Sequence, residues 1–333
     1  MAEDIYFDYN DTDEDAFNYA TIGPKPPQSA KSGNIVLGVL KIIIFLLGIS
    51  GNGAVIWICV LKMKKSVNST WYLSLAVSDF IFCFFLPFDS VREFTSKWVF
   101  GLFMCKFISF IMFLNMFSSI FLLVLISVDR CVSVVFPVWS QNHRSVRAAS
   151  VLVVLAWVIS TLCSIPSLIF RQMKENDTCY NNWDKQTHQA VAVNRFVFGF
   201  VISLIIITVC YTIIILKLKS NRMTKSSKPF KVMTALIVTF FICWMPYHVF
   251  ILIEIDHEKH HKDIFSFGIP FSVTLACANS FMNPFLYAFM GKDFKKTFRS
   301  SLFSKIANAI DEDVQTTSKG QSNTLDSKIS TQI

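Results

Sequence analysis

The feature that most constrains this chain is a series of apolar stretches, each close to the roughly 20 residues that a helix needs to cross the hydrocarbon core of a membrane. Inside their limits the only formally charged side chain is Asp79, and His248 is the other group that titrates near neutral pH. The stretches are residues 42–61, 66–88, 107–128, 148–170, 196–216, 232–253 and 264–290. They predict an all-α membrane protein with seven transmembrane helices, because a large soluble helical protein does not keep charge out of so many long segments.

Composition and charge patterning agree with this prediction. Only 16% of the residues are charged and 53% are hydrophobic, whereas soluble domains carry about 25% charged residues. Lys and Arg cluster after the first, third, fifth and seventh stretches, which places those ends in the cytosol by the positive-inside rule. The formal charge of +8 therefore reflects membrane topology and not a nucleic-acid partner. We expect a multi-pass plasma-membrane protein whose first helix directs insertion without a cleaved signal peptide.

The chain divides into three regions on these grounds. Residues 1–34 carry an acidic segment that we expect to be extracellular and disordered. Residues 35–303 form the seven-helix domain, including a short amphipathic helix at 292–303 whose apolar stripe can lie on the bilayer surface. Residues 304–333 form a cytoplasmic tail rich in Ser and Thr.

Two of the nine cysteines lie on the exterior side of the predicted topology, where oxidising conditions permit a disulfide. These are Cys105 and Cys179, so we predict that they are bonded. Asn10 and Asn176 each begin an Asn-Asp-Thr glycosylation sequon on the same side.

Short motifs occur in order along the predicted helices, and together they are very specific. They are Gly51-Asn52, Leu75-Ala76-Val77-Ser78-Asp79, Asp129-Arg130-Cys131, Cys243-Trp244-Met245-Pro246 and Asn283-Pro284-Phe285-Leu286-Tyr287. With Trp157 in the fourth helix, this set resembles the rhodopsin-like G-protein-coupled receptors over residues 35 to 303. The resemblance implies a receptor that binds an extracellular ligand, activates a heterotrimeric G protein and recruits arrestin after phosphorylation of its tail.

Asp79 lies within the bilayer, where an ionised carboxyl persists for a function or with a partner. In the resembled family, a polar cluster at this place holds a sodium ion that favours the inactive state. The corresponding residues here are Asp79, Asn115, Ser119 and Asn279. The alternative is a knot of interhelical hydrogen bonds without an ion, and in either case we expect no other cofactor.

The resemblance also implies an activation switch towards the cytosolic side. Arg130 is expected to pair with Asp129 or to extend to the membrane interface, and the pair could serve topology alone. Pro246 and Pro284 interrupt their helices, so each can act as a hinge. The implied switch residues are Asp129, Arg130, Tyr211, Phe240, Trp244, Pro246, Asn283, Pro284 and Tyr287. Ser203 stands where the fifth helix of the family has a proline, which puts a bulge at that place in doubt.

Longer stretches resemble the chemoattractant receptors, a group that includes the formyl peptide, anaphylatoxin and chemerin receptors, and the chemerin branch matches best. The stretches include Ser140-Gln141-Asn142-His143-Arg144-Ser145-Val146-Arg147 and Cys179-Tyr180-Asn181-Asn182. Arg171 and Arg195 are expected to close the fourth helix and open the fifth, facing a cavity where they can grip a carboxylate. The alternative is that both only anchor helix ends at the membrane interface. The candidate ligand-binding residues are Arg171, Arg195, Glu254, Phe113 and Tyr180.

The sequence therefore predicts a receptor for a peptide or small-protein chemoattractant, coupled to an inhibitory-class G protein and surrounded by membrane lipids. The alternatives are a scavenging or arrestin-biased receptor of the same fold and, more distantly, a transporter or channel. No nucleophile–base constellation or metal-ligand cluster suggests an enzyme.

Overall fold

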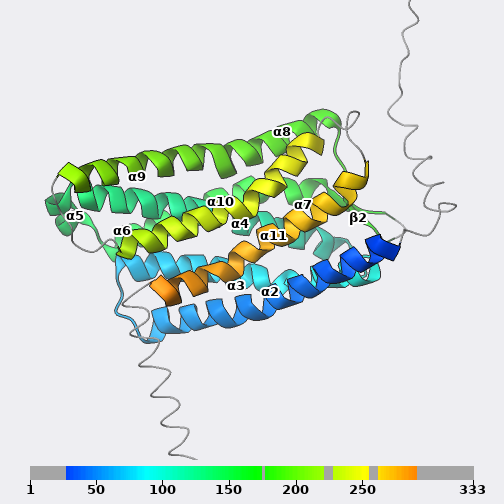
Figure 1. Cartoon of the computed structure of the whole chain (residues 1–333), viewed down its shortest axis with the longest axis horizontal. Coiled ribbons are helices and arrows are strands. Elements are labelled where there is room, and N and C mark those ends of the chain that lie inside the picture. The colour runs from blue at the N-terminus through cyan, green and yellow to red at the C-terminus, as the bar shows by residue number, and fades with distance from the viewer. Residues whose placement is uncertain (1–27, 175–176, 221–227, 255–261, 291–333) are drawn as a thin grey trace, which may run out of the picture.

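The computed structural model describes residues 28–174, 177–220, 228–254 and 262–290. Its helices and strands in chain order are α2 (Gln28–Leu61), α3 (Val67–Thr95), α4 (Gly101–Val135), α5 (Pro137–His143), α6 (Val146–Ser164), α7 (Pro166–Phe170), β1 (Arg171–Met173), β2 (Cys179–Asn181), α8 (Lys185–Phe196), the π-helix η1 (Val197–Val201), α9 (Ile202–Ser220), α10 (Lys228–Glu254) and α11 (Lys262–Met290). The long helices run alongside one another in one elongated bundle, in which α8, η1 and α9 form a continuous rod (Figure 1).

Several predicted features lie outside the described residues. They are the amphipathic helix 292–303, the tail 304–333, the glycosylation sites Asn10 and Asn176, and the side chain of Tyr287. Of the predicted disordered segment 1–34, residues 28–34 belong to α2.

Within the described part of the chain, six stretches are long and apolar enough to span a membrane: Gly33–Leu61, Val67–Thr95, Gly101–Val135, Val146–Phe170, Lys185–Lys219 and Thr234–Glu254. Helix α11 has 29 residues but is not among these six stretches, because its polar residues Asn279, Ser280 and Asn283 lower its mean hydropathy. Large apolar side chains on α6 and α9 are exposed on the outside of the bundle, among them Val154, Leu155, Ile205 and Val209. Such a surface suits lipid rather than water, because hydrocarbon chains cover it without cost.

Helix α4 is the central element of the bundle. In the most apolar segment of α4, 67% of the residues are buried inside the bundle. In the corresponding segment of the stretch that contains α6, only 22% are buried. Phe117, Ile120 and Leu122 of α4 are fully buried in the main core cluster. Residues placed on α4 can therefore reach several other helices.

Helix α2 packs closely on α3 and α11 because it presents glycines to them. A Cβ atom at Gly48 would lie 2.3 Å from Sγ of Cys83, so a side chain there would force the helices apart. At Gly51, of the Gly51-Asn52 motif, a Cβ atom would lie 3.0 Å from Cβ of Pro284. These contacts bring the polar residues of α2, α3 and α11 within reach of one another.

The helices extend beyond the limits predicted from hydropathy, and this corrects the prediction at one end of the bundle. Helix α3 continues to Thr95, seven residues beyond the expected limit at 88. Helix α8 begins at Lys185 rather than near residue 196, because Asp184 caps it by accepting hydrogen bonds from the backbone N–H groups of Gln186 and Thr187. A further bond from the Thr187 hydroxyl holds the pKa of the exposed Asp184 carboxyl below its usual value. Arg195 therefore lies within a helix and does not open one.

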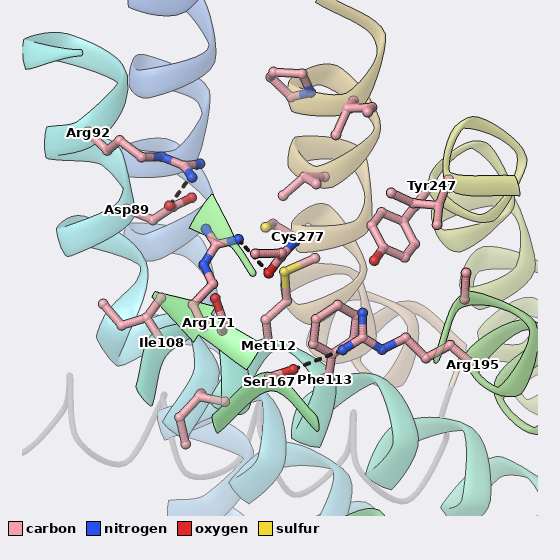
Figure 2. Close-up of a pocket in the computed structure, with 18 of the residues that line it drawn as sticks. Asp89, Arg92, Ile108, Met112, Phe113, Ser167, Arg171, Arg195, Tyr247 and Cys277 are labelled. Carbon is pink, nitrogen blue, oxygen red and sulfur yellow. Dashed lines mark hydrogen bonds and ion pairs between the residues drawn. The ribbon is translucent and has the colours of Figure 1, made fainter. Parts of the chain in front are cut away.

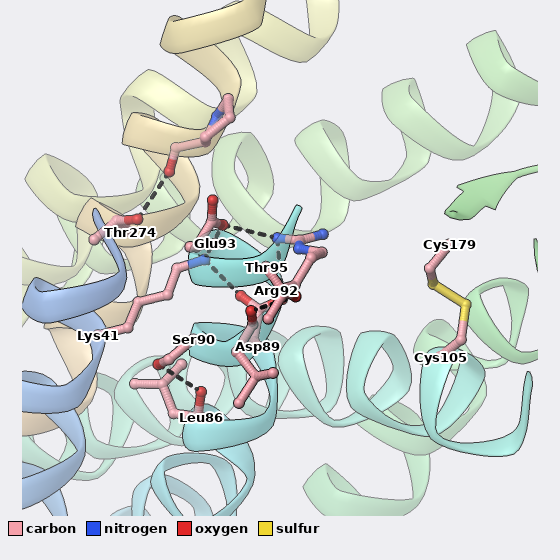
Figure 3. Close-up of polar contacts among 12 residues, drawn as sticks. Lys41, Leu86, Asp89, Ser90, Arg92, Glu93, Thr95, Cys105, Cys179 and Thr274 are labelled. Carbon is pink, nitrogen blue, oxygen red and sulfur yellow. Dashed lines mark hydrogen bonds and ion pairs between the residues drawn. A yellow bond between two sulfur atoms is a disulfide. The ribbon is translucent and has the colours of Figure 1, made fainter. Parts of the chain in front are cut away.

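The predicted disulfide is confirmed. Cys105 in α4 is bonded to Cys179 in β2, with their Cα atoms 5.9 Å apart (Figure 3). The strands β1 and β2 pair antiparallel, with Arg171 opposite Asn181 and Met173 opposite Cys179. The bond therefore ties this hairpin to the central helix at one end of the bundle, which we call the disulfide end.

Candidate functional site

A cavity of about 830 Å³ opens at the disulfide end. Its walls come from α2, α3, α4, α7, α8, α10, α11 and the segment around β1 and β2 (Figure 2). The lining combines apolar residues such as Phe85, Leu86 and Val273 with charged ones, a composition typical of a ligand site.

Arg195 is the most deeply buried cation that lines this cavity. Only 6% of it is exposed. Its guanidinium carbon lies 3.4 Å from the ring centroid of Phe113, and one terminal nitrogen donates to the Ser167 hydroxyl at 2.9 Å (Figure 2). Its Nε has no hydrogen-bond partner, and the described residues provide no ion pair for it. The cation–π contact stabilises the charge only in part, so an anion at this place would be bound favourably.

Arg171 also lines the cavity and has no carboxylate partner among the described residues. Its Nη1 donates to the Asn181 side chain at 3.0 Å, and its Nε contacts Sγ of Cys179 at 3.1 Å. Burial, followed by the nearby charge of Arg92, lowers the pKa of Arg171 to about 10, so it is still protonated at neutral pH. Two arginines therefore present positive charge to one cavity.

The other candidate ligand residues are placed differently. Phe113 and Glu254 line the cavity, and a carboxyl oxygen of Glu254 lies 4.0 Å from Nε2 of His188 at its rim. Tyr180 is not among the lining residues, and the ammonium group of Lys174 lies 5.1 Å from its ring centroid. A role for Tyr180 in binding stays a prediction.

A network of four charged side chains beside this cavity was missed by the sequence analysis. Lys41 of α2 is fully buried and donates to both Asp89 and Glu93 of α3, each at 2.6 Å (Figure 3). Arg92 contacts the same two carboxylates at 3.0 and 3.1 Å. The two cations and two anions form a closed, neutral ring that joins α2 to α3. The spacing of Asp89, Arg92 and Glu93 was the available signal, since residues three and four apart share a helix face.

Asp79 lies at the centre of a buried polar cluster between α2, α3, α4 and α11. Its carboxylate accepts hydrogen bonds from the side-chain amides of Asn115 at 2.9 Å and Asn283 at 2.7 Å. Three further oxygens in the same region are buried without a hydrogen-bond partner among the described residues: Oγ of Ser119, Oδ1 of Asn279 and Oδ1 of Asn52. Asn283, assigned from the sequence to the activation switch, thus also contacts Asp79.

Asp129 is held by a residue that the sequence analysis did not assign to this site. Nε and Nη2 of Arg144, which follows α5, donate to the two carboxylate oxygens of Asp129 at 2.7 and 2.8 Å. Arg130 approaches Asp129 only to 3.9 Å, and it donates to the Asn68 side chain, which also accepts from Arg144. The expected Asp129–Arg130 pair is therefore present, but the tighter, two-pronged contact comes from Arg144.

Aromatic contacts connect the cavity to the middle of the bundle. Phe113 lies 6.1 Å from Tyr247, Tyr247 lies 5.8 Å from Trp244, and Trp244 lies 6.1 Å from Phe240, measured between ring centroids. The last three residues belong to α10, which contains Pro246 within this stretch. Tyr211 on α9 packs against the same core, and Pro284 interrupts α11. We call Phe113, Tyr247, Trp244 and Phe240 the aromatic column, because their side chains contact one another in series. A displacement of Arg195 would therefore be transmitted to the aromatic column through Phe113.

Comparison with known proteins gives consistent matches over most of the chain. Residues 51–287 match the family described as 7 transmembrane receptor (rhodopsin family). The chain is 46% identical over 310 residues to Chemerin-like receptor 1 of Homo sapiens, a match that covers 86% of this chain and 83% of that protein. It is 39% identical over 316 residues to the C3a anaphylatoxin chemotactic receptor of Oncorhynchus mykiss, covering 88% and 86%. Chemerin-like receptor 2 of Mus musculus is 35% identical over 315 residues, covering 91% and 89%.

Replacing Lys41 should destabilise the protein, because Lys41→Met leaves Asp89 and Glu93 with only Arg92 to balance them. Breaking a buried ion pair by removing one partner costs about 3–5 kcal/mol of the free energy of unfolding. We therefore expect a clearly lower Tm for the detergent-purified variant. Lys97→Met provides the control, since Lys97 is exposed. An unchanged Tm for Lys41→Met would show that the ring contributes nothing to stability.

Proposed function

The chain belongs to the rhodopsin family of seven-transmembrane receptors, and we propose that it is a cell-surface receptor for a peptide or small-protein chemoattractant that activates an inhibitory-class G protein. The observation that carries this proposal is the pair of arginines, the buried Arg195 and the half-buried Arg171, which face one cavity without a carboxylate partner in the described residues. We place the disulfide end outside the cell and the basic loops in the cytosol.

The chemistry of the cavity favours an acidic group on the ligand. A guanidinium binds a carboxylate through two parallel hydrogen bonds, and Nε of Arg195 is a donor that still lacks an acceptor. The C-terminal carboxylate of a peptide supplies such a group at the end of a flexible chain. The relatives described as chemerin-like and as a C3a chemotactic receptor support a chemoattractant of protein origin.

The packed aromatic column supports a route from ligand to G protein. A ligand that engages Arg195 must contact or displace Phe113, whose ring lies under the guanidinium. Tyr247 and Trp244 follow in the column, on either side of Pro246. Because a proline leaves a helix without one backbone hydrogen bond, α10 can bend there and move its cytosolic end. We assign this movement the role of opening the face beside Arg130 to the G protein, with arrestin binding later through the phosphorylated tail.

The Asp79 cluster fits a bound sodium ion. Sodium is a hard cation that prefers oxygen ligands, and the cluster offers the carboxylate of Asp79 with the unpartnered oxygens of Ser119 and Asn279. Asn115 and Asn283 orient that carboxylate through their amide groups. A bound cation would neutralise Asp79 and hold α3, α4 and α11 together in the resting state.

Arg195→Ala should weaken the potency of an acidic peptide agonist by about 10–150-fold, because removing a charge-assisted hydrogen bond costs ~1.5–3 kcal/mol. Amidation of the peptide C-terminus should weaken binding to the unmodified receptor yet matter little in Arg195→Ala. Arg195→Lys should restore only part of the potency, since the lysine ammonium cannot make the two parallel hydrogen bonds that a guanidinium makes with a carboxylate. The potencies of the free-acid and amidated peptides at each receptor variant are measured as calcium release in transfected cells.

The control for this experiment is Lys185→Ala, because Lys185 is an exposed cation that also lines the cavity. It should leave the potency ratio of free acid to amide unchanged. Independent, additive effects of amidation and Arg195→Ala would mean that Arg195 does not contact the peptide terminus.

Asp79→Asn should abolish the inhibition of agonist binding by sodium, because it removes the negative charge of the cluster while keeping its shape. Agonist affinity is measured with sodium and with a large organic cation at equal ionic strength, so that general screening is the same in both. Sodium inhibition that survives in Asp79→Asn would leave a hydrogen-bonded cluster without an ion.

Arg144→Ala should lower agonist-stimulated nucleotide exchange by about 3–10-fold, that is by ~0.7–1.4 kcal/mol. Without Arg144, the carboxylate of Asp129 is free to close on Arg130 and retain it. Arg147→Ala is the matched control, because Arg147 is an exposed cation three residues away. If Arg144 acts through Asp129, Arg144→Ala adds nothing in an Asp129→Asn background. A rise in exchange for Arg144→Ala would contradict this role.

A further inference from the structure

The rod that carries Arg195 contains one wide turn between the cavity and the middle of the bundle. In η1, Val197–Val201, the backbone follows a π-helix, and the N–H of Ile202 donates to the carbonyl of Val197. A π turn adds a residue to the helix without adding a turn. Because a regular helix advances about 100° per residue, everything before η1 is rotated by about 100° relative to an uninterrupted helix.

This rotation decides where Arg195 points. Below the turn, Ser203 and Ile207 of α9 are buried in the bundle. In an uninterrupted helix Arg195 would lie about 80° around the axis from Ser203, whereas one added residue reduces that angle to about 20°. The face of α8 that lines the cavity consists of Lys185, His188, Ala192 and Arg195, and Val193 lies outside it with 47% of its surface exposed.

The hydroxyl of Ser203 makes the contact that keeps the turn open. It is buried, with 2% of the residue exposed, and donates to the carbonyl of Phe198 at 3.0 Å, five residues back. The carbonyl of Phe198, which lies inside the π turn, thereby gains a hydrogen-bond partner. Gly199 provides room on the same side, since a Cβ atom there would lie 3.2 Å from Cε of Met116 and 3.4 Å from Cε1 of Phe117 in α4.

We propose that Ser203 is a positioning residue: its hydrogen bond to Phe198 holds the π turn open and thereby directs Arg195 onto Phe113 and Ser167 in the cavity. Closing the turn would carry Arg195 and His188 away from the cavity and bring Val193 towards it. The role of Ser203 in ligand recognition rests on the proposed function, but its effect on the rotation of α8 does not.

The rotation is measured without a ligand, by labelling Val193→Cys from outside the cell with a water-soluble methanethiosulfonate. We place residue 193 against the lipid, where its thiol stays protonated and unreactive, because the thiolate that attacks the reagent forms in water. We expect slow labelling with Ser203 present and labelling at least about tenfold faster in Ser203→Ala, whose turn closes. The background is the rate of the same protein without the introduced cysteine.

Two variants that should keep the turn open serve as rescue. Ser203→Thr keeps a hydroxyl donor, and Ser203→Pro is compatible with the open turn because proline cannot make the regular helical N–H bond. Both should keep labelling slow. Equally slow labelling in Ser203→Ala would overturn the proposal, as would fast labelling in Ser203→Pro, which decides the matter if Ser203→Ala fails to reach the surface.

A second readout connects the turn to the ligand. The potency ratio between a free-acid peptide and its amide should shrink in Ser203→Ala and persist in Ser203→Thr. A receptor that shows no such ratio with Ser203 intact would refute the carboxylate site of the proposed function, while the labelling result would still stand. A full ratio in Ser203→Ala, together with slow labelling, would refute the positioning role.

Discussion

The absence of water around the bundle is the constraint on which the rest of this structure depends. In hydrocarbon, a charged or polar group that lacks a partner within the protein is costly, so burial and pairing must go together. Lys41 is fully buried and is matched by two carboxylates, and Asp79 is matched by two amides. Arg195 is the informative exception in the described residues, because its buried charge rests on an aromatic ring and a hydroxyl. That imbalance is the basis of the anion site that we propose.

The same constraint explains how the ends of the bundle can communicate. Buried polar contacts have few alternative arrangements, so a ligand that satisfies Arg195 changes the balance of a tightly packed neighbourhood. Phe113 links that neighbourhood to Tyr247 and Trp244 of α10. At the opposite end, Arg144 rather than Arg130 holds both oxygens of Asp129. A movement of α10 would therefore have to link the aromatic column at one end of the bundle to this ion pair at the other.

Much of the architecture could be predicted from the sequence, because membrane spans are determined by the length and apolarity of single segments. The disulfide was also predictable, since the topology leaves only Cys105 and Cys179 outside. What escaped prediction depends on contacts between distant segments or on short-range capping. The charged ring around Lys41 lies outside the helix limits that hydropathy predicts. The two hydrogen bonds from Arg144 to Asp129 depend on how the segment after α5 folds. The cap formed by Asp184 makes α8 begin earlier than its hydropathy indicates. The π turn was put in doubt because a serine, unlike a proline, is not a sequence signal for an interrupted helix.

The most direct measurement of the central claim is an experimental structure of the receptor with a bound peptide agonist that has a free C-terminus. The account predicts that a terminal carboxylate oxygen lies about 2.7–2.9 Å from Nε of Arg195, with Arg171 on its other side. That position would give an acceptor to Nε of Arg195, which is buried without a hydrogen-bond partner. A peptide terminus that lies away from both arginines, with Nε of Arg195 still lacking an acceptor, would contradict the account.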